Sequence, residues 1–175
     1  IHSVGCAVQI LKPGDRVVVG AITPDFRCTN CQRGYPSQCN QMLGGWRFSN
    51  VRDGVFADYF LVNDAEANLA IIPEGIPDDV AVYCSDMLST GFMGAEHAEI
   101  PLGGTVAVFA LGPVGLMAIK GARLLGGAFI IGVDSIPKRQ ELALHYGADV
   151  IVDQTKMDPV EEILRLTCAE GVDSA

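Results

Sequence analysis

The chain has 175 residues, 49% of which are hydrophobic, and a formal net charge of −9 at pH 7. This composition predicts a globular protein and not a disordered one, and the length allows one domain or parts of two. The negative charge argues against a nucleic-acid partner, because phosphates would be repelled. The sequence contains no apolar run of about 18 residues, so neither a membrane span nor a membrane partner is expected.

The two ends of the sequence resemble interrupted strands. Ile1-His-Ser-Val4 resembles the middle of a strand and Gly171–Ala175 the beginning of another, and there is no initiator Met and no secretory pattern. We therefore expect an internal piece of a longer protein. The six cysteines are too sparse for a secreted disulfide scaffold, which favours a cytoplasmic location and a metal site.

The N-terminal half predicts a β-rich domain. The turn residues Pro13-Gly-Asp15 precede a valine-rich strand at Val17–Val19. Two further strands are expected at Gly54–Val62, where apolar residues roughly alternate, and at Asn68–Pro73. A helix is expected to begin near Pro77, with acidic residues in its first turn.

Three cysteines cluster in a loop rich in turn residues. Cys28, Cys31 and Cys39 supply three thiols, whereas a closed structural zinc site needs four ligands. Asp25 precedes Cys28 by the same interval that separates Cys28 from Cys31, so its carboxylate is the candidate fourth ligand. The alternative is a metal-free loop that retains the cysteines of a lost site. The absence of a second cysteine pair argues against a zinc ribbon that binds nucleic acid.

Two other side chains in this half are ambiguous from the sequence. Trp46, the only tryptophan, lies in a glycine-flanked loop and either forms the wall of an apolar pocket or covers the core. Asp86 lies in the apolar segment Cys84–Ala95, where a carboxylate is either paired with a metal or caps a helix.

From Gly103 onward, strand and helix patterns alternate regularly. Strands are expected near 105–111, 129–134 and 149–153, and helices near 113–125, 137–146 and 158–168. Right-handed crossovers would place the three strands in one parallel sheet. Gly147 is expected to end the second of these helices.

The first strand and helix of this series are joined by a degenerate dinucleotide-binding fingerprint, Ala110-Leu-Gly112-Pro-Val-Gly115, in which alanine replaces the first glycine. Gly112 would allow close approach of a pyrophosphate, and Gly115 would allow the helix to pack on the strand. The helix begins at Pro113 and Val114 and would offer free N–H groups to the phosphates. Asp134 follows Gly115 by about 20 residues, where a carboxylate would bind the adenosine ribose; alternatively, it caps the next helix.

Many short motifs along almost the whole chain resemble the medium-chain, zinc-dependent alcohol dehydrogenases, and among them the microbial secondary-alcohol dehydrogenases most closely. These motifs are Lys12-Pro-Gly-Asp-Arg-Val17, Ala21-Ile-Thr-Pro-Asp25, Gln32-Arg-Gly-Tyr35, Gly45-Trp-Arg-Phe-Ser-Asn50, Asp53-Gly-Val-Phe56, Val62-Asn-Asp64, Asp86-Met87, Thr90-Gly-Phe92, Gly94-Ala-Glu96 and Gly112-Pro-Val-Gly-Leu-Met117.

The resemblance implies an α/β chain with part of a GroES-like catalytic domain in residues 1–89. Residues 90–175 would form the first half of a Rossmann domain with a doubly wound parallel sheet. Asp86 matches a carboxylate ligand of the catalytic zinc, whose other ligands would lie before Ile1. His2 and Cys6 do not match those ligands.

The resemblance also places Ala21, Ile22 and Trp46 beside a small apolar alcohol pocket, and Thr90 near the cofactor. The loop containing Asp25 matches the family's structural zinc lobe. The expected cofactors are therefore Zn²⁺ and a nicotinamide dinucleotide, and the expected substrate is a small secondary alcohol or ketone. The complete protein is expected to be a homodimer or homotetramer, and the fragment alone to be inactive.

The cofactor preference follows from a departure from the family pattern. The best-known members of the branch prefer NADP and carry Gly-Ser-Arg where this chain has Asp134-Ser135-Ile136. An acid would repel a 2′-phosphate and bind a 2′-hydroxyl, so the sequence predicts NAD in preference to NADP. A related zinc dehydrogenase acting on a polyol or aldehyde, and a non-catalytic member of the superfamily, remain the alternatives.

Overall fold

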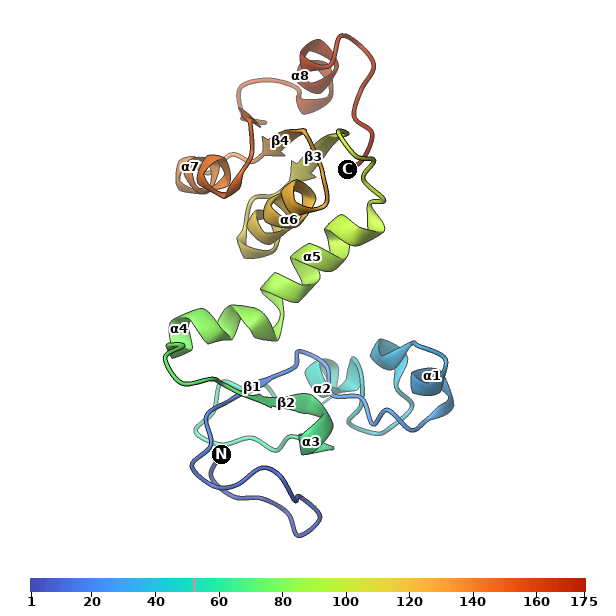
Figure 1. Cartoon of the computed structure of the whole chain (residues 1–175), viewed down its shortest axis with the longest axis vertical. Coiled ribbons are helices and arrows are strands. Elements are labelled where there is room, and N and C mark those ends of the chain that lie inside the picture. The colour runs from blue at the N-terminus through green and yellow to red at the C-terminus, as the bar shows by residue number, and fades with distance from the viewer. Residues whose placement is uncertain (52) are drawn as a thin grey trace. The chain divides into compact units, whose positions relative to one another are not determined.

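A computed structural model of the chain describes residues 1–51 and 53–175 (Figure 1). The chain divides into two compact units, Ile1–Asp86 and Met87–Ala175. The division falls three residues before the expected domain boundary between residues 89 and 90.

The first unit is built from short elements. They are β1 (Val17–Val19), α1 (Thr29–Gln32), η1 (Pro36–Gln38), α2 (Arg47–Asn50), α3 (Ala65–Asn68), β2 (Leu69–Ile71), α4 (Asp78–Ala81) and η2 (Val82–Ser85). Strands β1 and β2 pair antiparallel, with Val18 opposite Ala70. The predicted strands at Val17–Val19 and around Ala70 are therefore confirmed, and α4 begins directly after Pro77 as predicted.

The predicted strand at Gly54–Val62 is wrong, because these residues are irregular. Phe56 is fully exposed and Leu61 is 66% exposed, so their alternating apolar side chains face no packed layer within the described residues. A strand also needs a hydrogen-bonding neighbour, and β1 and β2 pair with each other. Ile1–Val4, which resembles a strand in sequence, is likewise irregular.

A buried polar network fixes the loop that follows β1. The hydroxyl of Thr23 is fully buried and lies 2.9 Å from both the Leu43 carbonyl oxygen and Asn63 Oδ1, so it donates to one of them at a time. The buried amide of Asn68 donates to the Pro24 carbonyl oxygen at 3.0 Å. Because buried polar groups need partners, these bonds hold the chain in one path up to Asp25.

The second unit confirms the predicted alternation of strands and helices. It contains α5 (Met87–His97), β3 (Thr105–Phe109), α6 (Pro113–Leu124), β4 (Phe129–Val133), α7 (Pro137–Tyr146), β5 (Val150–Val152) and α8 (Pro159–Leu166). The three strands form a parallel sheet in the order β3-β4-β5. Gly147 ends α7 in the left-handed conformation, with φ 118°, as its position predicts.

Both faces of this sheet are covered. Ile130 of β4 is fully buried in a cluster with Ile119 of α6 and Ala143 of α7. The next residue, Ile131, points to the opposite face and packs with Ile163 of α8. Strands that are apolar on both faces are typical of parallel sheets between helices. The predicted fold class, a β-rich part followed by the beginning of a Rossmann-like sheet, is confirmed.

Within residues 1–51 and 53–175, no helix is both long enough and apolar enough to cross a membrane.

Candidate metal and cofactor sites

The turn between β3 and α6 has the shape of a phosphate-binding loop, although it lacks the first glycine of the fingerprint. Ala110, which replaces that glycine, adopts φ 68°, in the left-handed region that glycine favours. An L-residue in this region is strained by roughly 1–2 kcal/mol. The buried side chain of Leu111 and the start of α6 at Pro113 hold the loop in this conformation.

The two remaining glycines of the loop have different roles. A Cβ atom at Gly115 would lie 2.1 Å from the Ala110 carbonyl oxygen, so α6 can approach the end of β3 only if residue 115 is glycine. A Cβ atom at Gly112 would meet no protein atom within 4 Å. Packing within the second unit therefore requires glycine at position 115 but not at position 112. The surface of the loop at Gly112 is open to a ligand at the N-terminus of α6.

Asp134 lies directly after β4 and joins that strand to the loop. Its carboxylate accepts hydrogen bonds from the backbone N–H of Leu111 (2.7 Å) and of Ile136 (2.8 Å). Burial alone would raise the pKa of Asp134, but these N–H donors outweigh it and hold the pKa below its usual value. The carboxylate is therefore ionised. Helix α7 has Ile136 as its N-cap residue and no side-chain cap, so Asp134 does not serve as the helix cap.

Arg139 is a residue of this site that the sequence analysis missed. Its guanidinium Nη1 lies 3.8 Å from Asp134 Oδ2, and its side chain is about half exposed. The position could have been found from the sequence, because the first turns of a helix that follows a strand lie near the end of that strand. The Asp134 carboxylate therefore has a cation beside it.

Thr90 lies one residue before Gly91, where α5 packs closely against α6. A Cβ atom at Gly91 would lie 2.6 Å from the Val114 carbonyl oxygen, so the two helices touch here. Thr90 itself is half-buried. The structure thus brings Thr90 near the N-terminal turn formed by Pro113 and Val114, and its contact with a cofactor stays a prediction.

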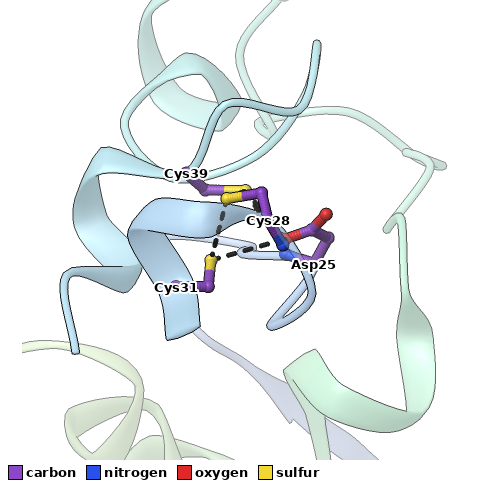
Figure 2. Close-up of side chains that lie close together, drawn as sticks. All are labelled: Asp25, Cys28, Cys31 and Cys39. Atoms are coloured by element: carbon purple, nitrogen blue, oxygen red, sulfur yellow. Dashed lines mark hydrogen bonds between the residues drawn. The ribbon is translucent and has the colours of Figure 1, made fainter. Parts of the chain in front are cut away.

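In the first unit, the four predicted structural ligands converge (Figure 2). One ligand atom from each of Asp25, Cys28, Cys31 and Cys39 lies within 4.8 Å of all the others. The Sγ atom of Cys28 is 3.5 Å from that of Cys31 and 3.9 Å from that of Cys39. Oδ1 of Asp25 lies 3.4 Å from Cys31 Sγ and 3.3 Å from Cys39 Sγ.

These separations match the edges of a zinc tetrahedron. With Zn–S bonds of about 2.3 Å and Zn–O bonds near 2.1 Å, the expected edges are about 3.8 Å between two sulfurs and about 3.6 Å between sulfur and oxygen. The donor set of three thiols and one carboxylate is also one that zinc accepts. The residues therefore fit a structural zinc ion.

Backbone amides hold three of the four side chains in place. Oδ1 of Asp25 accepts from the N–H groups of Arg27 (3.0 Å) and Cys28 (3.1 Å). The sulfur of Cys28 accepts from the N–H of Asn40 at 3.4 Å, and that of Cys39 from the N–H of Asp25 at 3.4 Å. Such bonds orient the ligands before any metal binds.

The acid–base state of this cluster depends on the metal. Burial would raise the pKa of Asp25, but the N–H groups of Cys28 and Arg27 outweigh it, and the pKa lies well below its usual value. Without metal, burial followed by the hydrogen bond with Cys28 raises the pKa of Cys31 to about 12. Binding of zinc would therefore release the Cys31 proton, so zinc affinity rises with pH across the neutral range.

The predicted alcohol-site residues of the first unit are linked through Ala21. Its N–H donates to the Ser85 carbonyl oxygen at 3.3 Å, and its own carbonyl oxygen accepts from the Ser49 hydroxyl at 3.0 Å. Ser85 directly precedes Asp86, and Ser49 lies in α2, whose N-cap is Trp46. The sequence analysis missed both serines. Ser49 contributes only its hydroxyl and Ser85 only its backbone carbonyl oxygen, and single contacts of this kind produce no recognisable sequence motif.

The side chains around Ala21 are accessible in this unit. Asp86 is exposed, Trp46 is 55% exposed and Ile22 is half-buried. More than half of Trp46 is therefore exposed, and its place beside an alcohol pocket stays a prediction. Among the described residues, Asp86 does not belong to a group of three or more potential metal ligands. Its role as a ligand stays a prediction.

Comparison with known proteins identifies the two units. Residues 1–74 match the family model for the alcohol dehydrogenase GroES-like domain, and residues 113–175 match that for zinc-binding dehydrogenases. The chain is 54% identical over its full length to an NADP-dependent isopropanol dehydrogenase of Thermoanaerobacter brockii, of which it covers 50%. It is 44% identical to an alcohol dehydrogenase of Cupriavidus necator, with 100% of the chain and 52% of the relative covered.

A solved structure shows the same likeness. The apo form of a zinc-dependent alcohol dehydrogenase from Streptococcus pneumonia superposes with a TM-score of 0.86 at 33% identity, over 98% of this chain and 48% of the other. The chain thus spans about half the length of the relatives it matches. The two family models match successive parts of the chain, the relatives match it from end to end, and both agree with the observed fold and glycine loop. The chain therefore belongs to the zinc-dependent alcohol dehydrogenase family.

Proposed function

We propose that the complete protein transfers a hydride between small secondary alcohols or ketones and a nicotinamide dinucleotide, with zinc in its catalytic site. The observation that carries the proposal is the loop at the N-terminus of α6, where Gly112 is open and the ionised Asp134 lies alongside. The substrate class rests on the relative from Thermoanaerobacter brockii, whose name specifies isopropanol. The apolar side chains of Ala21, Ile22 and Trp46 suit such a substrate better than a polyol.

Different residues of this chain would bind the cofactor and the substrate. Gly112 and the free N–H groups at the start of α6 would hold the pyrophosphate, and Asp134 would accept hydrogen bonds from the adenosine ribose. Asp86 would supply one carboxylate ligand to the catalytic zinc, and Trp46 would exclude water beside the alcohol. When bound, the zinc supplies Lewis acidity that lowers the pKa of the alcohol.

We further propose that the complete enzyme prefers NAD to NADP. The names of several of the most similar relatives specify NADP, so their printed names support the opposite preference. The proposal rests instead on Asp134, because an ionised carboxylate would repel a 2′-phosphate and would accept a bond from a 2′-hydroxyl. Arg139 offsets part of this repulsion but remains about half exposed to water.

A direct assay tests the enzyme class. The complete protein is expected to oxidise 2-propanol with NAD, to do so more slowly with NADP, and to lose activity on treatment with a chelator. Activity with NADP alone would retain the enzyme class and overturn the cofactor preference. Absence of activity with both cofactors would contradict the proposed reaction and would favour the polyol or non-catalytic alternatives.

Asp86→Ala in the complete protein is expected to remove the catalytic zinc and to lower kcat/KM by at least about 100-fold, since even the loss of outer-shell partners of a metal lowers activity 10- to 100-fold. Metal content per chain and 2-propanol oxidation provide the measurements. Asp79→Ala, in the nearby helix α4, serves as the matched control and should change neither. Retention of both zinc and activity in Asp86→Ala would contradict the ligand role.

We also propose that Asp25, Cys28, Cys31 and Cys39 bind a structural zinc ion. Asp25→Asn is expected to lower the zinc affinity of this loop by roughly 10- to 100-fold, because the amide oxygen still accepts the two backbone N–H bonds but carries no charge. Competition with a chromophoric chelator measures this affinity.

Asp64→Asn provides the control for Asp25→Asn. Asp64 pairs with Arg27 of the same loop but is not one of the four clustered ligands. Its substitution should leave zinc affinity unchanged. Equal affinity in the Asp25→Asn variant and in the unmodified protein would show that Asp25 is not a ligand.

The complete protein is finally proposed to assemble as a homodimer or homotetramer, as its family membership suggests. Light scattering of the full-length protein measures this directly, and a monomer would contradict it.

A further inference from the structure

The three clustered thiols also have the geometry of a redox-active group. Cys28 is the central member, since its sulfur lies 3.5 Å from that of Cys31 and 3.9 Å from that of Cys39. Each separation is close to van der Waals contact, so either pair is a candidate for an S–S bond of about 2.05 Å.

Accessibility distinguishes the two possible pairs. Cys28 and Cys31 are both partly exposed, whereas Cys39 is only 5% exposed. Cys39 is also held by the N–H of Asp25 at 3.4 Å and lies 3.3 Å from Oδ1 of the same residue. A small oxidant therefore reaches Cys28 and Cys31 first, and the shorter of the two sulfur contacts joins these same residues.

We propose that Cys28 and Cys31 form a reversible disulfide when the protein meets a hydroperoxide such as hydrogen peroxide. This inference adds a site of covalent modification to the proposed zinc lobe. The pairing depends only on the geometry of the thiols, and its coupling to metal release rests on the proposed structural zinc.

The oxidation of the two thiols takes place in two steps. The Cys28 thiolate attacks one peroxide oxygen, the O–O bond breaks, and Cys28 becomes a sulfenic acid while hydroxide leaves. The Cys31 sulfur then attacks the Cys28 sulfur, forming the S–S bond and expelling the sulfenic oxygen as hydroxide, which leaves as water once protonated. Overall, two thiols are oxidised and one hydrogen peroxide is reduced to two waters. A dithiol reductant reverses the change by thiol–disulfide exchange.

Oxidation of this pair would remove two of the four proposed zinc ligands. Asp25 and Cys39 alone cannot complete a tetrahedral site, so the loop would release its zinc as the disulfide forms. Reduction would restore all four ligands, since the N–H bonds that orient Asp25 do not involve a sulfur.

The test uses the full-length protein treated with one equivalent of hydrogen peroxide. Remaining thiols are alkylated, the protein is digested without reduction, and peptides are mapped by mass spectrometry while a zinc indicator follows metal release. The expected product is a Cys28–Cys31 crosslink, with one zinc released for each disulfide formed. Cys31→Ser should abolish this crosslink, and Cys39→Ser should leave it intact.

Cys168→Ser is the matched control, because Cys168 is exposed and lies outside the cluster. It should change neither the rate of crosslinking nor zinc release. A Cys28–Cys39 crosslink in the unmodified protein would overturn the proposed pairing. Oxidation of Cys6, Cys84 and Cys168 while the clustered thiols stay reduced would overturn the redox role altogether.

The same experiment separates failure of this inference from failure of the zinc proposal. A Cys28–Cys31 crosslink in protein whose loop binds no zinc would support the redox pair and contradict the structural metal. Zinc retained on reduced thiols after peroxide would contradict the redox pair and support the metal site.

Discussion

Replacing Asp134 by glycine together with Ile136 by arginine is expected to raise the preference for NADP over NAD by roughly 1,000-fold. A hydrogen bond to a charged group is worth about 1.5–3 kcal/mol, and the change removes such a bond to the ribose of NAD. It also removes the repulsion of the 2′-phosphate and supplies a guanidinium that can bind it bidentately. Since 1.4 kcal/mol corresponds to a factor of ten, about 4 kcal/mol in total gives this ratio.

The ratio of kcat/KM values for the two cofactors is the quantity to measure in the complete enzyme. The Asp134 carboxylate also anchors the N–H groups of Leu111 and Ile136, so thermal unfolding must be followed in parallel. Asp134→Asn removes the charge and keeps an acceptor oxygen for only one of these two N–H groups. It should lower discrimination against NADP and also lower stability, because the amide NH2 would face the other N–H.

A double variant that still rejects NADP would show that Asp134 and Ile136 do not determine the cofactor. The unmodified enzyme can also contradict the argument, by using NADP better than NAD. In that case Arg139, which lies 3.8 Å from Asp134, becomes the first residue to replace, because it is already placed to meet a phosphate.

Gly115→Ala is expected to destabilise the second unit by about 3 kcal/mol or more. The new methyl group would lie 2.1 Å from the Ala110 carbonyl oxygen, which belongs to the backbone and cannot rotate away. Helix α6 must therefore move off β3, and overpacking of this kind typically costs 1–3 kcal/mol even against side chains. Denaturant unfolding of the full-length protein, followed by a probe in the second unit, measures the effect.

Gly112→Ala is the matched control for Gly115→Ala. It makes the same chemical change three residues earlier, where a Cβ atom meets nothing within 4 Å and φ is −70°. Its stability should be unchanged, whereas its affinity for the dinucleotide should fall because the methyl group occupies the approach of the pyrophosphate. Equal destabilisation by both substitutions would contradict the separate roles of the two glycines.

The second unit could be predicted from sequence because local pattern and tertiary structure agree there. Runs such as Phe129–Val133 are apolar throughout, and the turns contain the residues that those turns require. The first unit was harder to predict, since its elements are short and their pairing is not local: β1 pairs with β2 across some fifty residues. Gly54–Val62 alternates like a strand but has no partner strand in the described structure, and alternation alone does not supply one.

The candidate sites show the same contrast. Cysteine spacing was enough to group Asp25 with Cys28, Cys31 and Cys39, because the four residues are close in sequence. Arg139 was missed because its approach to Asp134 depends on how α7 follows β4. The link from Ser49 to Ala21 was missed because it spans 28 residues and uses a backbone oxygen. Sequence patterns thus reveal ligands within one loop more readily than contacts between elements.

The amide bonds to Asp25 have a consequence for how the loop exchanges metal. Because Oδ1 accepts from two N–H groups, and Thr23 and Asn68 fix the preceding residues, hydrogen bonds within the protein orient part of the ligand set. The entropy of ordering the ligands is then lost during folding and not during metal capture. Zinc binding by this loop would then carry a smaller entropic cost than binding by a loop that has to order its ligands around the ion.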